Sequence, residues 1–328
     1  MKKDNHCDDL NRCFLALTLA LIFLFLPSAY GQGMPGAQIE TEQQGNQGEH
    51  LKMQQLRTLP DKAADSDSDK VLPPTPMDEA LGQQRILKRK PVYKPFSVFA
   101  ESSFNATNNV ALTRYNKVED QYLLLTTGAS YQPLLTSNLI GEVTVMEQWY
   151  RYKTYTELNF ESMNLGGGLT YMVPAIPRLA VYGRYGYNRL TGGDVNSELF
   201  QNHTFTFGLF RSFPLSRAHY LYGGASAQWG LSNYKDFERN IYAASMGYHL
   251  DMTEILSFDM SSRFSFVPYS RNDRRDTNET LYAGITLKPI NYLYFQVFSS
   301  AGLNQSNQSS FYYDVLNFGG SAGIQFRF

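Results

Sequence analysis

The chain has 328 residues, with 29 Lys and Arg against 30 Asp and Glu, and its formal net charge is -1. This balance gives no electrostatic case for a nucleic-acid partner. The mean hydropathy is -0.35, and no apolar run after residue 31 approaches the roughly 20 residues that a spanning helix needs. Aromatic residues are frequent, at 14% of the chain.

The first expected element is a secretion signal over residues 1–31 that is removed from the mature protein. Two lysines at the start precede a short apolar run, Phe14 to Leu26. Ala29 and Gly31 follow at a spacing that a signal peptidase accepts. Both cysteines of the chain lie in this segment, so the sequence predicts a mature protein with neither a disulfide nor a thiolate metal site.

Residues 32–94 are polar and largely aperiodic, which predicts a disordered or linker segment. Within it, residues 77–90 are suited to a short helix because Asp78 and Glu79 stand at its start and Lys88 and Arg89 near its end. The segment is expected to be a solvated tether. The alternatives are a plug that enters the following domain and a docking helix for a partner.

Alternating apolar and polar residues begin after Pro95 and continue to Phe328. The clearest example is the segment from Ile255 to Phe266. Its apolar face carries Leu256, Phe258, Met260, Phe264 and Phe266. Such period-two patterns predict half-buried strands, and residues 95–328 hold about twelve of them.

The connections between these strands alternate in length. Short links occur at Asp251 to Glu254 and Lys288 to Asn291, whereas long polar links occur at Asn105 to Asp120 and Pro268 to Glu279. An even strand number with alternating connections predicts an all-β fold, a transmembrane antiparallel up-and-down β-barrel with both mature termini on the periplasmic side. A secreted β-sandwich is the alternative fold.

Aromatic residues near the ends of the expected strands suggest how such a barrel would sit in a bilayer. Trp149, Tyr150 and Tyr152 lie at the loop end of one strand, and Tyr292 and Tyr294 lie beside a short turn. Because Tyr and Trp favour the interface between a bilayer and water, the pattern predicts two aromatic girdles.

The chain ends in SAGIQFRF, which resembles the C-terminal assembly signal of bacterial outer-membrane β-barrel proteins. Ser321, Gly323, Phe326 and Phe328 fill the polar, glycine and terminal aromatic positions of that signal. The resemblance implies insertion into the outer-membrane lipid bilayer by the barrel-assembly machinery. It indicates no subfamily.

Candidate lumen residues lie opposite the apolar rows, and they include acids, arginines and amides. They are Glu142, Thr144, Gln148, Tyr182, Arg184, Asn188, Ser226, Gln228, Asp259 and Arg263. Such a set suits a weakly selective pore, and it equally suits a salt-bridged interior that closes the barrel, because about twelve strands fall between packed and open barrels. Glu147 shares a face with apolar Val145 and Trp149, so a bulge or a loop-end position is expected there.

The polar link near residue 273 is rich in charges. It carries Arg271, Arg274 and Arg275 beside Asp273 and Asp276. We expect a solvated loop whose charges pair with one another. Binding of anionic lipid sugars or of another ligand is the alternative.

The sequence leaves three functions to compare. The first is a porin-like channel for small polar solutes. The second is a non-conducting barrel with a structural, adhesive or secretion and assembly role, through surface loops or the N-terminal segment. The third is an outer-membrane hydrolase, but none of His50, His203, His219 and His249 belongs to a recognisable nucleophile motif. We therefore expect no enzymatic activity, no cofactor and no metal site.

Overall fold

A computed structural model of the chain describes residues 93–192, 197–216, 218–271 and 273–328. The expected signal segment, the expected helix at 77–90 and all but the last two residues of the 32–94 segment lie outside the described residues. No helix in the described part is long and apolar enough to cross a membrane.

Twelve strands make up most of the described chain. They are β1 (Phe96–Thr107), β2 (Asp120–Tyr131), β3 (Leu139–Tyr152), β4 (Phe160–Met172), β5 (Leu179–Gly192), β6 (Glu198–Pro214), β7 (His219–Ser232), β8 (Asn240–Asp251), β9 (Leu256–Pro268), β10 (Arg275–Ile290), β11 (Leu293–Ser306) and β12 (Tyr313–Arg327). Short 3-10 turns, η3 (Thr156–Leu158) and η4 (Ser309–Phe311), lie in two of the connections.

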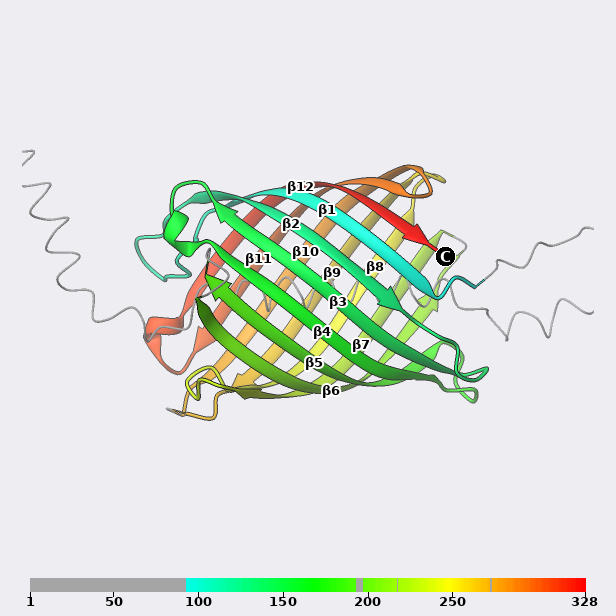
Figure 1. Cartoon of the computed structure of the whole chain (residues 1–328), viewed down its shortest axis with the longest axis horizontal. Coiled ribbons are helices and arrows are strands. Elements are labelled where there is room, and N and C mark those ends of the chain that lie inside the picture. Colours follow the sequence, from blue (N-terminus) through cyan, green and yellow to red (C-terminus); the bar gives the residue numbers. More distant parts are fainter. Residues whose placement is uncertain (1–92, 193–196, 217, 272) are drawn as a thin grey trace, which may run out of the picture.

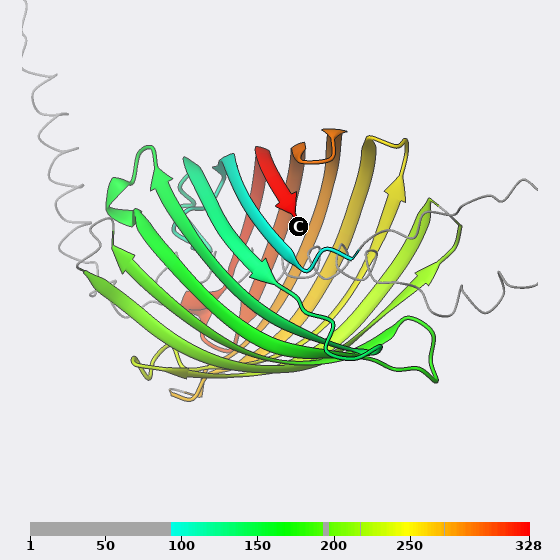
Figure 2. The same ribbon diagram turned by 45° about the vertical axis from the view of Figure 1, so that its right-hand side comes forward.

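Each strand pairs with its neighbours in sequence, and β1 pairs antiparallel with β12 to close the barrel (Figure 1). At the seam, Phe328 donates its amide to the Phe96 carbonyl at 2.8 Å, and Phe96 donates in return at 3.3 Å. The expected antiparallel up-and-down barrel of twelve strands is confirmed. Because the strand number is even, β1 starts and β12 ends at the same end of the barrel, as Figure 2 also shows.

The connections at that end are short, for example 252–255 and 291–292, and we call it the turn end. The opposite loop end carries the connections 108–119, 153–159, 193–197, 233–239, 269–274 and 307–312. Most of these are shorter than the sequence suggests. Half of the polar link Pro268 to Glu279 belongs to β9 and β10, because inward-facing polar strand residues resemble loop residues in sequence.

The outward face of the strands is apolar. Its exposed side chains include Val143, Phe207, Met246, Val297 and Phe318. They alternate with buried or half-buried side chains that face the interior, as the period-two pattern of a strand requires. A continuous apolar surface of this kind is stable only in apolar surroundings.

The predicted girdles are partly wrong. Trp149 and Tyr292 face outward, and the Tyr292 ring stacks on Phe326 with centroids 5.5 Å apart. In contrast, Tyr150 is fully buried and Tyr152 nearly so, because even-numbered residues of β3 point inward. Neighbouring aromatic residues on one strand cannot share a face.

Glu147 faces outward without a bulge. β3 pairs in unbroken register on both sides, with Glu147 opposite Thr127 and Met163, so of the two explanations expected there, a bulge or a loop-end position, the bulge is wrong. Farther toward the loop end, the outward-facing Arg151 forms an ion pair with Glu161 on β4. The outward apolar face therefore gives way to charged residues on the loop-end side of β3 and β4.

Candidate functional site

All ten candidate lumen residues lie on the inward face of their strands. Those on β3 to β7 contact one another and further inward-facing polar residues. Arg184 on β5 forms an ion pair with Glu142 on β3 at 2.6 Å, and its guanidinium lies over the Tyr182 ring at 5.3 Å. Among the amides, Asn188 donates to Asn164 Oδ1 at 2.8 Å, and Gln228 accepts from Thr206 at 3.4 Å.

The ion pair between β3 and β5 spans the intervening strand at Gly168. This glycine stands directly opposite both Glu142 and Arg184. A Cβ atom added at Gly168 would lie 2.6 Å from Arg184 Cγ and 2.7 Å from the Gly183 carbonyl oxygen. The ion pair therefore requires a residue without a side chain on β4.

The loop end of this side of the barrel is filled by an apolar cluster. Its buried members are Val110, Tyr122, Leu124, Tyr150, Tyr152, Phe160, Leu190 and Phe200. Tyr150 stacks on Phe160 with centroids 4.1 Å apart. Val118, Tyr155 and Phe237 pack against the cluster from three of the loop-end connections, so loops and strands fill the interior together.

The connection 108–119 is held down by a buried amide. Asn109 Nδ2 donates to the carbonyl of Thr113 at 2.7 Å and to that of Asp314 on β12 at 2.8 Å. Asn109 Oδ1 accepts from the Thr113 amide at 3.0 Å. These bonds keep Val110 inside the barrel, where it is only 1% exposed.

A cavity of about 190 Å³ lies on the opposite side, toward the turn end. We call it the turn-end cavity. Its lining includes Glu101, Asp259, Ser261, Tyr282, Tyr294, Gln296, Ser300, Asn317 and Gln325. The Tyr294 hydroxyl on β11 donates to Glu101 Oε2 on β1, across the intervening strand β12. Carboxylates, amides and aromatic rings therefore share this cavity.

Gly323 makes the bond between Tyr294 and Glu101 possible. It stands opposite Tyr294, and a Cβ atom added there would lie 2.3 Å from Tyr294 Cζ. We expect Gly323→Ala to displace the ring and to lower the free energy of unfolding by about 1–3 kcal/mol, as overpacking does. Urea unfolding of the protein in lipid vesicles would measure this free energy of unfolding. Gly320→Ala is the control because Gly320 faces outward, with only one atom within 4 Å of an added Cβ. Equal stability of both variants would contradict the expected role of Gly323.

His249 lies on the inward face between two carboxylates. Its Nδ1 is 2.6 Å from Asp259 Oδ1, and its Nε2 is 3.0 Å from Asp251 Oδ1. Both ring nitrogens therefore face a carboxylate. Among the described residues, no group of three or more His, Cys, Asp and Glu side chains could hold a metal ion.

A second cavity of about 40 Å³ lies nearer the loop end, and we call it the loop-end cavity. It is lined by Arg239, Ile241, Arg263, Ser265, Val267, Tyr269, Asp276, Asn278, Asn304 and Tyr313. Burial alone would lower the pKa of Arg239, but the Tyr269 hydroxyl and the Asp276 carboxylate raise it, so this guanidinium stays charged. Arg263 is one of two predicted lumen residues that line the cavities described here, and Asp259 is the other.

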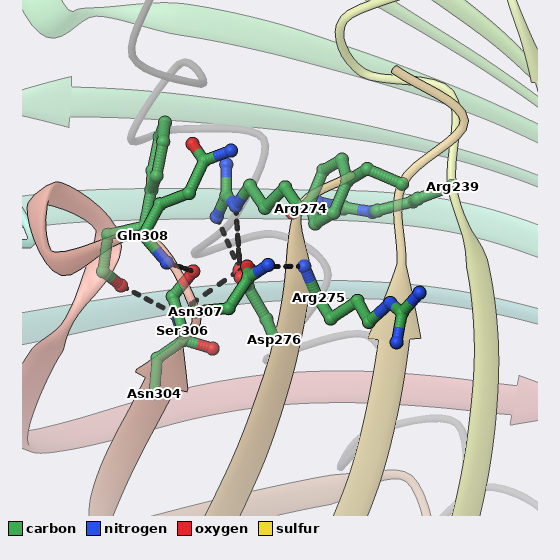
Figure 3. Close-up of polar contacts among 10 residues, drawn as sticks. Arg239, Arg274, Arg275, Asp276, Asn304, Ser306, Asn307 and Gln308 are labelled. Atoms are coloured by element: carbon green, nitrogen blue, oxygen red, sulfur yellow. Dashed lines mark hydrogen bonds and ion pairs between the residues drawn. The ribbon is translucent and has the colours of Figure 1, made fainter. Parts of the chain in front are cut away.

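Arg274 binds Asp276, which lines the loop-end cavity (Figure 3). Its Nε donates to both carboxylate oxygens of Asp276 at 3.0 Å, and its guanidinium lies 3.4 Å from the Phe311 ring centroid and 4.2 Å from that of Tyr269. Asn304 Nδ2 also donates to Asp276, at 3.3 Å. Arg274 and Asp276 are buried, so the expectation that they belong to a solvated loop is wrong, although they do pair with each other. Arg271 remains exposed and pairs with Asp236.

The two cavities are neighbours on the wall formed by β9 to β12. On β10, Asn278 lines the loop-end cavity and Tyr282 the turn-end cavity, with Thr280 between them. Gly302 on β11 and Val315 on β12 continue the same row, in register with Thr280. On β9 no inward residue separates Arg263 from Ser261. The row in register with Thr280, namely Arg263, Gly302 and Val315, therefore lies between the two cavities.

Several residues of these cavities were not among the candidates from the sequence. Glu101 was detectable, because it alternates with the apolar residues of β1. For Arg274 and Asp276, the sequence predicts a loop position. Arg239 carries no local signal, because it lies in a connection and reaches the cavity only through the tertiary fold.

No protein-family model matches the sequence, and no curated protein matches it. Among solved structures, an outer membrane channel from Pseudomonas putida F1 is similar with a TM-score of 0.51 at 12% identity, over 72% of this chain and 97% of that chain. The translocator domain of autotransporter NalP from Neisseria meningitidis has a TM-score of 0.42 at 11% identity, over 87% of this chain and 98% of that chain. The first similarity shows a shared barrel fold.

Proposed function

We propose that the protein is a bacterial outer-membrane channel for small polar solutes, and that the solute moves along the wall formed by β9 to β12. The observation that carries this proposal is the position of the two polar cavities along the same strands, on either side of the row Arg263, Thr280, Gly302 and Val315. Such a path offers successive hydrogen-bonding groups to a solute that leaves water. No catalytic step is part of this function.

The outward apolar face supports a bilayer as the surroundings of the barrel, since a closed barrel satisfies all its backbone groups internally. In this proposal the turn end, with Phe96 and Phe328, faces the periplasm, and the loop end faces the outside of the cell. The fold shared with a known outer membrane channel agrees with this location.

A non-conducting barrel is the second candidate function. The ion pair between Glu142 and Arg184 and the apolar cluster around Tyr150 favour it, because they fill the β3 to β6 side of the interior. In that case the surface loops or residues 32–90 would carry a structural, adhesive or assembly role. The two candidates differ in whether the remaining path conducts.

Reconstitution in a planar bilayer tests the proposed function. Steady single-channel current is expected from the purified full chain or from a form that lacks residues 32–90. Current only in the truncated form would make the N-terminal segment a plug of the same channel. Silence in both forms would refute the channel and favour the non-conducting barrel.

The C-terminal assembly signal gives a separate prediction. Phe328 faces outward and is 64% exposed, so its side chain contributes little to the packing of the barrel. We expect Phe328→Ala to slow membrane insertion markedly, because the barrel-assembly machinery would lose its terminal aromatic contact. A pulse-chase experiment that follows the appearance of the folded, heat-modifiable form would measure the rate of insertion. Val297→Ala, at a similarly exposed outward position on β11, is the control. If the Phe328→Ala variant inserted at the normal rate, Phe328 would not be part of an assembly signal.

A further inference from the structure

We propose that the turn-end cavity is a binding site for a neutral, polyhydroxylated solute of the size of one sugar ring. This inference deepens the proposed channel function and rests on it for the passage of the solute along the wall of β9 to β12. The binding site itself is defined by the lining of the cavity, so it can be tested without conduction.

Aromatic rings lie flat along the wall of the turn-end cavity. Four of them cover an inward-facing glycine that stands directly opposite on the adjacent strand, and a Cβ atom added to that glycine would lie 2.2 to 2.6 Å from a ring carbon. The pairs are Phe99 and Gly128, Tyr222 and Gly247, Tyr294 and Gly323, and Phe298 and Gly319. Because glycine has no side chain, each ring lies against the backbone and turns its other face to the cavity.

Tyr282 extends this aromatic wall on β10. Its ring plane is within 26° of parallel to that of Phe298 on β11, and the two ring centroids are 6.0 Å apart. The faces of aromatic rings are negative, so they attract the weakly positive C–H groups of a sugar ring. The wall therefore offers a surface on which the apolar face of such a ring packs.

Side-chain amides lie on the same wall as the rings. Gln296 on β11 donates its Nε2 to Thr286 Oγ1 at 3.1 Å, and Asn317 on β12 donates its Nδ2 to Ser300 Oγ at 3.3 Å. All four of these side chains line the cavity. Each bond uses one N–H of an amide that has two N–H groups and a carbonyl oxygen, so donors and acceptors remain for the hydroxyl groups of a solute.

The charged groups of the cavity favour a neutral ligand. Glu101 accepts from the Tyr294 hydroxyl, and Asp259 Oδ1 lies 2.6 Å from His249 Nδ1. Lys288 lines the same cavity, so both signs of charge are present. Because the carboxylates are engaged by groups of the protein and the charges are mixed, we assign recognition to hydrogen bonds and ring contacts and not to a net charge.

The size of the cavity suits one sugar ring. A volume of about 190 Å³ corresponds to roughly a dozen water positions or more, since one water molecule needs about 10–15 Å³ of such space. A single sugar ring with its hydroxyl groups has a comparable number of heavy atoms. An apolar wall with a few convergent polar groups is also the usual lining of a small-molecule site.

Saturation-transfer difference NMR of the folded full chain, in a detergent without a sugar headgroup, tests the inference without requiring conduction. The neutral probes are D-glucose, D-mannose and myo-inositol, titrated separately, and choline chloride is the cationic comparison. A saturable signal is expected from at least one of the neutral probes.

Two leucine variants on β11 test the role of the rings. Phe298→Leu keeps an apolar side chain but removes the ring over Gly319, and it is expected to weaken the binding of that probe about threefold to tenfold, the contribution of one aromatic contact. Phe295→Leu makes the same change at an outward-facing, exposed position and is expected to leave the affinity unchanged. Should the Phe298 variant fail to fold, Gln296→Leu removes an amide from the same wall and is expected to weaken binding by a similar factor.

The outcomes separate the inference from the channel function. No saturable signal from any of the neutral probes, binding of choline alone, or equal affinities of the two phenylalanine variants would overturn the inference even if the protein conducts. Saturable binding in a protein that is silent in bilayers would support the site and refute the channel. Unchanged affinity in the folded Gln296 variant would contradict the site.

Discussion

A Thr280→Trp variant is expected to fold normally and to lose most of its ionic current, about tenfold or more. Thr280 lies on the inward face of β10, between Asn278 of the loop-end cavity and Tyr282 of the turn-end cavity. The residues opposite it are Gly302 on β11 and Arg263 on β9. A bulky apolar ring at this row narrows the path and removes the polar surface that a hydrated solute needs.

Leu281→Trp is the matched control for this experiment. Leu281 neighbours Thr280 on the same strand but faces outward, where it is exposed. Tryptophan there meets the apolar surroundings of the barrel and is expected to leave the current unchanged. Single-channel recording would compare the currents of the Thr280→Trp and Leu281→Trp variants. Undiminished current in the Thr280 variant would show that the solute does not pass along the β9 to β12 wall.

A Val110→Asp variant is expected to open the filled side of the barrel and to raise the single-channel conductance. Val110 belongs to the apolar cluster with Tyr122 and Tyr150. An unpaired carboxylate at this position would have no hydrogen-bond partner to offset its desolvation, at a cost of several kcal/mol. Release of the connection 108–119 avoids that cost. The strands are expected to persist, because the closed hydrogen-bond ladder does not depend on this connection.

Release of the connection 108–119 can also be measured by its sensitivity to trypsin. Arg114 and Lys117 lie in this connection, so they are expected to be cut faster in the Val110 variant. Ala111→Asp places the same charge on the exposed neighbouring residue and is expected to change neither conductance nor cleavage. If the Val110 variant showed unchanged conductance and cleavage, the connection would not close the loop end of the barrel.

Much of the architecture could be predicted from local patterns. Alternation along segments such as Ile255 to Phe266 assigns each residue to one of two faces, because successive strand side chains point in opposite directions. For this reason all ten candidate lumen residues lie on the inward face. The even number of segments and the absence of a long apolar run favoured a closed barrel over helices.

The same reasoning failed at the ends of the strands. There the inward face continues with polar residues such as Asp276 and Asn278, and the sequence resembles a loop. Aromatic residues were assigned by their closeness to an end and not by their face, so Tyr150 and Tyr152 were placed in a girdle instead of the interior. Counting every second residue along the strand would have placed both the polar residues and the two tyrosines on the inward face.

The sequence by itself determined which face each strand residue takes, because that property depends only on the period of the strand. Only the tertiary structure decided which inward residues meet. Arg184 reaches Glu142 two strands away over Gly168, and Arg239 enters the loop-end cavity from the connection 233–239. These contacts depend on the register of each strand pair and on the closure of the sheet. Both are set by bonds between residues that are far apart in the chain.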